Sequence, residues 1–131
     1  MEETLEFLKK CGTFYLATNE GNQPRVRPFG AVCAFEGKLY IVTNNQKKVF
    51  AQMQKNPKVE ISGMAGGQWI RLEAEAIHDS RREVRAAMLA DNEETLSRMY
   101  SADDQLMEVL YLQNATATIC TFAGEPEEYR F

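Results

Sequence analysis

The sequence predicts a mainly β protein with helical excursions, an α+β fold built on a small antiparallel barrel. Alternating or β-branched runs of strand length recur about seven times along the chain. Tight turns such as residues 20–22 (EGN) and 36–38 (EGK) join neighbouring runs, as in β-hairpins. The helical patterns are too few to act as crossovers between parallel strands. A chain of 131 residues is expected to form one such domain.

Turn and cap signals divide the chain into its expected elements. In chain order, we expect a helix at residues 2–10, strands at 13–18, 24–36 and 39–42, a helix at 46–55, strands at 58–62 and 68–78, helices at 80–91 and 93–100, strands at 106–112 and 116–122, and a short strand ending at 131.

The N-terminal helix has Leu5 and Leu8 on one face and ends at Gly12. The strand TFYLAT follows, and a turn leads into the long strand PRVRPFGAVCAFE. Pro28 has no N–H group to donate to a neighbouring strand, so this part of the strand is predicted to be an edge or a bulge. A missing neighbour would leave room there for a ligand.

The strand LYIV (residues 39–42) ends at a polar turn and leads into a helix. Val49, Phe50 and Met53 recur at helical spacing before Asn56-Pro57 stops the helix. Lys47 and Lys48 lie in its first turn, where the helix dipole already carries positive charge. This placement becomes favourable if an anion binds there, whereas the alternative is that both lysines are solvated surface residues.

Similar signals define the second half of the chain. KVEIS and QWIRLEAEAIH alternate, which puts Trp69 on the outer face and Ile70 and Leu72 in the core. SRRE at residues 80–83 has the pattern of a capping box and opens the third helix. The two strands after residue 105 are expected to be joined by a turn at residues 113–114.

Composition excludes several classes of function. A net charge of −4 argues against nucleic-acid binding, and Cys11, Cys33 and Cys120 contain no CxxC pair, which fits a reducing, cytoplasmic environment. A single histidine, His78, leaves no set of metal ligands and no catalytic triad. No segment has the roughly 20 apolar residues that a membrane span needs. Catalytic residues are therefore not assigned, and metal and membrane partners are not expected.

Cationic and polar residues nevertheless converge on one region. They come from the proline-containing strand, its hairpin partner and the following helix: Arg25, Arg27, Thr43, Asn44, Lys47 and Lys48. Together they describe an anion pocket. Such a pocket suits a phosphorylated cofactor, which a chain without catalytic groups of its own would need for chemistry.

Three segments resemble a known family: PRVRPFGAV, GKLYIVTNNQKKVFAQMQKNPKVEIS and QWIRLEAEAIHD. They are similar to the motifs of the pyridoxamine 5′-phosphate oxidase-like split-barrel flavoproteins, and the short chain looks more like the branch that includes nitroimidazole-resistance reductases. The resemblance implies an FMN-binding antiparallel split β-barrel and a homodimer with flavin at the subunit interface. The cofactor-binding residues that it implies are Arg25, Val26, Arg27, Pro28, Phe29, Thr43, Asn44, Lys47, Lys48 and Trp69.

The resemblance also implies roles for these residues. The segment 25–29 would border the flavin ring and ribityl chain, Lys47 and Lys48 would hold the phosphate, and Trp69 would cover the ring from the partner subunit. The chain ends in GEPEEYRF, without the arginine-rich segment that binds substrate in true pyridoxamine phosphate oxidases, which argues against vitamin B6 oxidation.

The leading hypothesis is therefore an FMN-dependent oxidoreductase that passes electrons from reduced nicotinamide to a small acceptor. A non-enzymatic protein that binds FMN or another anionic cofactor, as a sensor or store, is the alternative. A barrel that binds a different planar cofactor, such as haem or a deazaflavin, is a third hypothesis. The sequence identifies neither the electron donor nor the acceptor.

Overall fold

A computed structural model describes residues 1–131 and contains four helices and eight strands. In chain order the elements are α1 (Glu2–Cys11), β1 (Phe14–Glu20), β2 (Gln23–Phe29), β3 (Val32–Phe35), β4 (Lys38–Asn44), α2 (Lys48–Lys55), β5 (Lys58–Ala65), β6 (Gln68–Asp79), α3 (Arg82–Asp91), α4 (Glu93–Leu96), β7 (Met107–Thr121) and β8 (Glu127–Arg130).

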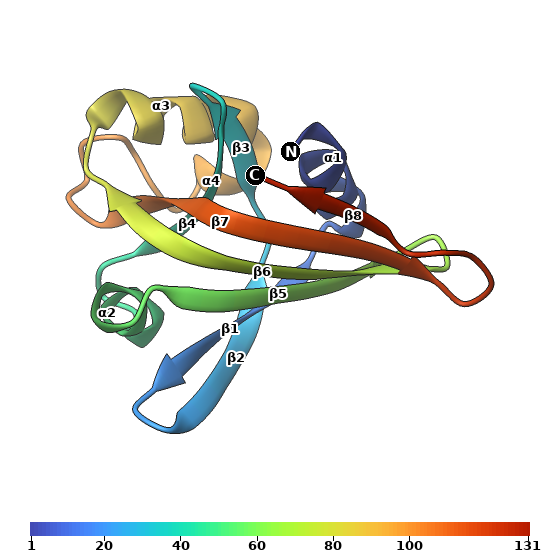
Figure 1. Ribbon diagram of the computed structural model, residues 1–131. Helices are drawn as coiled ribbons and strands as arrows, with labels where there is room; N and C mark the ends of the chain where they lie inside the picture. The colour runs from blue at the N-terminus through green and yellow to red at the C-terminus, as the bar shows by residue number, and fades with distance from the viewer.

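The strands form one antiparallel sheet, ordered β2-β1-β5-β6-β7-β4-β3, with β8 paired to β7. The path ends at β2 and β3, so the sheet curves without closing. Figure 1 shows the β1–β2 hairpin extending beyond the rest of the sheet. The helices α2 and α3 lie at different places on the sheet. This arrangement confirms the predicted α+β fold of the split-barrel type.

Two apolar clusters lie on the two sides of the sheet. The larger cluster contains Leu8, Phe14, Ile61 and Leu72 and is covered by α1 and α2. The smaller contains residues of β3, β4 and β7 packed against α3 and α4, with the fully buried Tyr40 among them. The strand β6 contributes Ile70 and Leu72 to the larger cluster, as its alternation predicted.

Several predicted boundaries are wrong. The strand expected at 24–36 is two strands, β2 and β3, which lie at opposite ends of the sheet. The strands expected at 106–112 and 116–122 are the single strand β7, and the turn expected at 113–114 is an irregularity opposite Glu73–Glu75, where Asn114 takes a positive φ of 49°.

The helix boundaries also shift. The helix α2 begins at Lys48, with Lys47 as its N-cap, instead of at residue 46. The expected capping box at 80–83 does not form, because Arg81 is the N-cap of α3 and makes no side-chain cap bond. The helix expected at 93–100 is only α4. By contrast, Pro28 lies on an edge strand, as predicted. No helix combines the length and the apolar character needed to cross a bilayer.

Candidate anion-binding site

Polar side chains fill the contact between α2 and the β1–β2 hairpin. The helix packs Val49 and Met53 into the larger core, and Gln52 lies beside this apolar stripe with only 7% of its surface exposed. Thr18 faces it from β1 and is 3% exposed. Buried polar side chains must find partners because unpaired ones cost free energy. These two bond to each other, with the Thr18 hydroxyl donating to Gln52 Oε1 at 2.6 Å.

Arg27, in the middle of β2, points its guanidinium group into this contact. Its Nη1 donates to the Leu16 carbonyl at 3.1 Å and to Thr18 Oγ1 at 2.8 Å, and its Nη2 donates to Gln52 Oε1 at 2.8 Å. Every acceptor is neutral. The alternation of the strand explains the position, since the buried Phe29 and the half-buried Arg27 share one face.

The charge of Arg27 has no anionic partner in the chain. It forms no ion pair. Burial of the guanidinium group, and secondly repulsion by Arg25, lower the pKa of Arg27. Its Nε–H has no acceptor, and only one acceptor serves the two hydrogens of Nη2. These neighbouring donors form the edge of a guanidinium group that binds a phosphate or carboxylate in bidentate fashion.

The nearest carboxylate in this network is already engaged. Glu20 Oε1 accepts hydrogen bonds from Arg25 Nε and Nη2 at 3.1 and 3.0 Å, and Glu20 Oε2 accepts one from Gln52 Nε2 at 3.3 Å. The hydrogen bonds from Arg25 and then from Gln52 lower the pKa of Glu20, so it stays ionised. Arg25 is thus compensated at the surface, whereas Arg27 is not.

The N-terminus of α2 adds further positive charge beside this network. Lys48 lies one helical turn before Gln52 and lines the same hollow as Gln52 and Glu20. The helix has no side-chain cap and no acidic residue in its first turn, and neither Lys47 nor Lys48 forms an ion pair. Uncapped N–H groups and free ammonium groups are suited to an anion.

Thr43 and Asn44 lie at the end of β4, where the chain turns into α2. Thr43 is 4% exposed, and its hydroxyl has no hydrogen-bond partner, which is costly for a buried polar atom. Asn44 is already bonded: its Nδ2 donates to the Tyr100 hydroxyl at 2.8 Å, and its Oδ1 accepts from the Gln46 N–H group. Asn44 therefore fixes the turn before Lys47.

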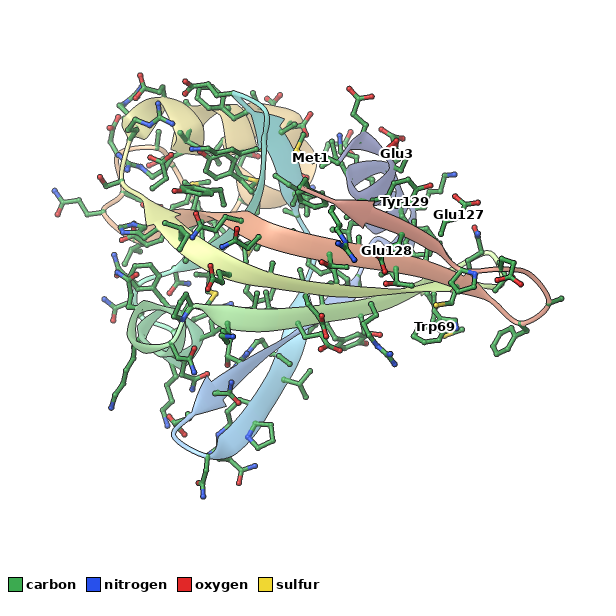
Figure 2. The ribbon with its side chains drawn as sticks, viewed as in Figure 1. Met1, Glu3, Trp69, Glu127, Glu128 and Tyr129 are labelled. Carbon is green, nitrogen blue, oxygen red and sulfur yellow. The ribbon has the colours of Figure 1, made fainter.

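The other predicted site residues do not join this cluster within one chain. Val26, which is 67% exposed, and the exposed Pro28 lie on the face of β2 opposite to Arg27. Phe29 belongs to the core. Figure 2 shows Trp69 at the start of β6, far from α2, and Arg71 stacks on its ring at 5.3 Å. Within one chain, Gln52 and Glu20 connect Arg27 to Arg25 by hydrogen bonds, and Lys48 lies one helical turn from Gln52. Lys47 precedes Lys48 as the N-cap of α2.

Sequence reasoning missed the side chains that hold the two arginines. Gln52 and Thr18, which hold Arg27, and Glu20, which holds Arg25, belong to no motif. A glutamine beside an apolar helical stripe is nevertheless a detectable signal. It also missed the half-buried pair of His78 Nε2 and Glu108 Oε1, 2.9 Å apart, in which Phe50 packs against the imidazole ring. The two residues of this pair lie on different strands, which the sequence does not place together.

Comparisons with known proteins place this geometry in context. The sequence profile of the family described as pyridoxamine 5′-phosphate oxidase matches residues 1–120. No curated protein gives a significant match. A NimC/NimA family protein from Clostridium acetobutylicum is similar in structure, with a TM-score of 0.93 and 58% identity over 98% of this chain and 93% of its own.

More distant structures share the fold. A heme binding protein from Mycobacterium smegmatis has a TM-score of 0.75 and 16% identity, and the match covers 98% of this chain and 57% of that protein. A FAD-binding protein from Mesorhizobium loti has a TM-score of 0.63 and 14% identity, over 92% of this chain and 94% of its own. At these identities the likeness concerns the fold alone.

Proposed function

The chain belongs to the pyridoxamine 5′-phosphate oxidase family, and from this premise we propose that it binds FMN and uses it as an oxidoreductase. The observation that carries the proposal is the cationic contact between α2 and β2. Arg27 is held there by neutral acceptors alone, beside a lysine and an uncapped helix N-terminus. A dianionic phosphate would supply the missing negative charge.

Each part of this contact has a role in the proposal. Lys48 is the closer phosphate ligand of the two lysines, because it shares a helix face with Gln52, whereas Lys47 precedes the helix. The free edge of Arg27 faces the same anion. The backbone of residues 25–29 borders the ring and the ribityl chain, and the unpartnered hydroxyl of Thr43 is available to a polar group of the cofactor.

A homodimer with the cofactor at its interface is part of the same proposal. Tyr15, Val26 and Met64 are large apolar side chains exposed on β1, β2 and β5. The sheet register puts them on one face with Trp69, since Tyr15 pairs with Pro28 and Met64 pairs with Trp69. An exposed apolar sheet face of this kind suits a second copy of the chain. Dimerisation would bring the partner's Trp69 toward the cofactor.

If bound, FMN would supply the redox chemistry, which would be hydride transfer from reduced nicotinamide and electron transfer to a small acceptor. The chain's own residues would bind and orient the cofactor: Lys48 and the free edge of Arg27 would hold its phosphate. FMN suits this site because its dianionic phosphate matches the unpaired cation of Arg27. The FAD-binding relative lends support to a flavin in this fold.

Two measurements test the proposal in order. FMN is titrated into the purified protein, and the loaded protein is then mixed anaerobically with NADH or NADPH. We expect FMN to bind, its absorbance to bleach, and its colour to return when an acceptor is added. A protein that takes up no FMN would refute the proposal at its first step. Binding without bleaching by either nicotinamide would favour the non-enzymatic alternative, a flavin sensor or store.

A further inference from the structure

Gln52 joins a cation and a carboxylate that do not touch each other. Its Oε1 accepts from Arg27 Nη2 at 2.8 Å and from Thr18 Oγ1 at 2.6 Å, while its Nε2 donates to Glu20 Oε2 at 3.3 Å. Arg27 and Glu20 therefore lie at the two ends of one amide group. Gln52 itself is buried, whereas Glu20 lies at the surface.

The surroundings fix the orientation of this amide. Its oxygen faces a guanidinium N–H group and its nitrogen faces a carboxylate. Rotating the amide by half a turn would direct NH₂ hydrogens at Arg27 and an oxygen at Glu20, so both contacts would become repulsive. One orientation is selected, and in it the amide offers Arg27 a neutral acceptor only.

Arg27 does not pair with Glu20, although Gln52 bonds to both of them. A half-buried guanidinium group is most simply stabilised by a carboxylate, and Glu20 is one amide group away. Gln52 and Arg25 instead occupy both oxygens of Glu20. The chain thus keeps Arg27 fixed in place without neutralising it.

We propose that Gln52 is a positioning residue that holds Arg27 with a neutral acceptor and keeps it from Glu20, so that its charge is left for the phosphate of the ligand. This proposal rests on the proposed function. It adds that Gln52 leaves the charge of Arg27 unpaired, so that a dianion can bind there. Gln52 acts through Arg27 and needs no ligand contact of its own.

The decisive variant is Gln52→Glu, which places a carboxylate where the neutral acceptor was. Its matched control is Gln54→Glu, the same change at an exposed position of the same helix. We expect Gln52→Glu to weaken FMN binding by roughly 10- to 100-fold, because Arg27 then pairs with the introduced carboxylate in place of phosphate. Riboflavin binding, which involves no phosphate, should change less than about threefold, and Gln54→Glu should change neither ligand's affinity beyond that factor.

A second pair of variants keeps the proposal testable if the buried carboxylate perturbs folding. In Gln52→Met, Arg27 is free to pair with Glu20, and FMN affinity should fall by roughly tenfold. Adding Glu20→Gln should restore most of that loss, since the competing carboxylate is gone. A purely structural role for Gln52 would show no such rescue, and that result would overturn the proposal.

One arm of the test does not depend on FMN. In ligand-free protein that carries Glu20→Gln, which removes the carboxylate that would repel a new one at position 52, Gln52→Glu should raise the melting temperature relative to Gln54→Glu, because it compensates Arg27. If the native protein binds no FMN, the proposed function fails, but this comparison still tests the inference. Equal melting temperatures, or equal losses of FMN and riboflavin affinity in Gln52→Glu, would contradict it.

Discussion

Two arginines in this molecule are held in opposite ways. Arg81, at the start of α3, donates through Nε and Nη2 to both oxygens of Asp79 at 3.1 and 2.9 Å, and it forms an ion pair with Glu36. The buried Tyr40 adds a hydrogen bond to Asp79 at 2.7 Å. Arg27 is held just as firmly, but only by carbonyl, hydroxyl and amide oxygens.

The difference separates a structural cation from a binding cation. The contacts of Arg81 tie the end of β6 to the β3–β4 hairpin, and its charge is satisfied inside the chain. The contacts of Arg27 fix its direction and leave its charge available. Arg81 is the N-cap of α3, Arg27 bonds to Gln52 of α2, and Figure 1 shows these two helices at different places on the sheet. The number of hydrogen bonds does not distinguish the two arginines. The charge of the acceptor groups does, because the acceptors are carboxylates for Arg81 and neutral oxygens for Arg27.

The largest effect is expected from removing the lysines beside Arg27. The double variant Lys47→Ala/Lys48→Ala loses two charge-assisted contacts, so FMN affinity should fall by roughly 100-fold or more while riboflavin affinity changes little. Fluorescence titration with both ligands measures this. Lys10→Ala on α1 is the control for a lost lysine elsewhere. Equal losses of affinity for FMN and riboflavin would show that the lysines do not bind the phosphate.

Replacing each arginine by methionine tests the comparison itself. Arg27→Met should weaken FMN binding by roughly tenfold or more and change the free energy of unfolding little. Arg81→Met should lower the free energy of unfolding, because Asp79 loses its main partner, and it should leave FMN affinity nearly unchanged. Urea unfolding of the ligand-free variants and FMN titration give the two quantities. If Arg27→Met lowered the free energy of unfolding and Arg81→Met weakened FMN binding, the distinction between a binding and a structural arginine would be wrong.

Acid should affect the Arg81 network. Hydrogen bonds from Arg81, with a further one from Tyr40, hold the pKa of Asp79 well below its usual range despite partial burial. A carboxyl with a lowered folded-state pKa contributes stability above its unfolded pKa, and this contribution is lost as the pH falls toward the folded value. Between about pH 5 and pH 2, Asp79→Asn should therefore lose less free energy of unfolding than the native protein. An equally steep decline would assign the acid sensitivity to other carboxyl groups.

The smallest effect is expected at Glu20. Glu20→Gln removes a negative charge beside Lys48 and Arg25, so FMN affinity should rise by roughly threefold, with no change for riboflavin. The gain should shrink at high salt, since the site is at the surface. Weaker FMN binding would mean that Glu20 serves the site chiefly by holding Arg25.

The sequence predicted those parts of the fold and site that depend on neighbouring residues. Alternation predicted the two faces of β6, and the proline predicted that β2 lies at an edge. The break between β2 and β3 was missed because the apolar run continues through Gly30 and Ala31, and the irregularity in β7 resembled a turn at Asn114.

The site was predictable to a similar extent. Lys47 and Lys48 precede or open α2 in the sequence itself, so a local argument about the helix dipole finds them. Thr18 and Gln52, by contrast, are 34 residues apart and meet only when α2 packs on β1. The distance between Trp69 and α2 likewise depends on the curvature of the whole sheet.

A crystal structure of the protein with bound FMN would test the proposed site most sharply. We expect the phosphate beside the N-terminus of α2, with its oxygens about 3 Å from Lys48 Nζ and from the free edge of Arg27. Gln52 should still bond to Arg27, and Glu20 should still bond to Arg25. A phosphate bound elsewhere, with Arg27 facing no anion, would show that Arg27 and Lys48 do not form the phosphate site.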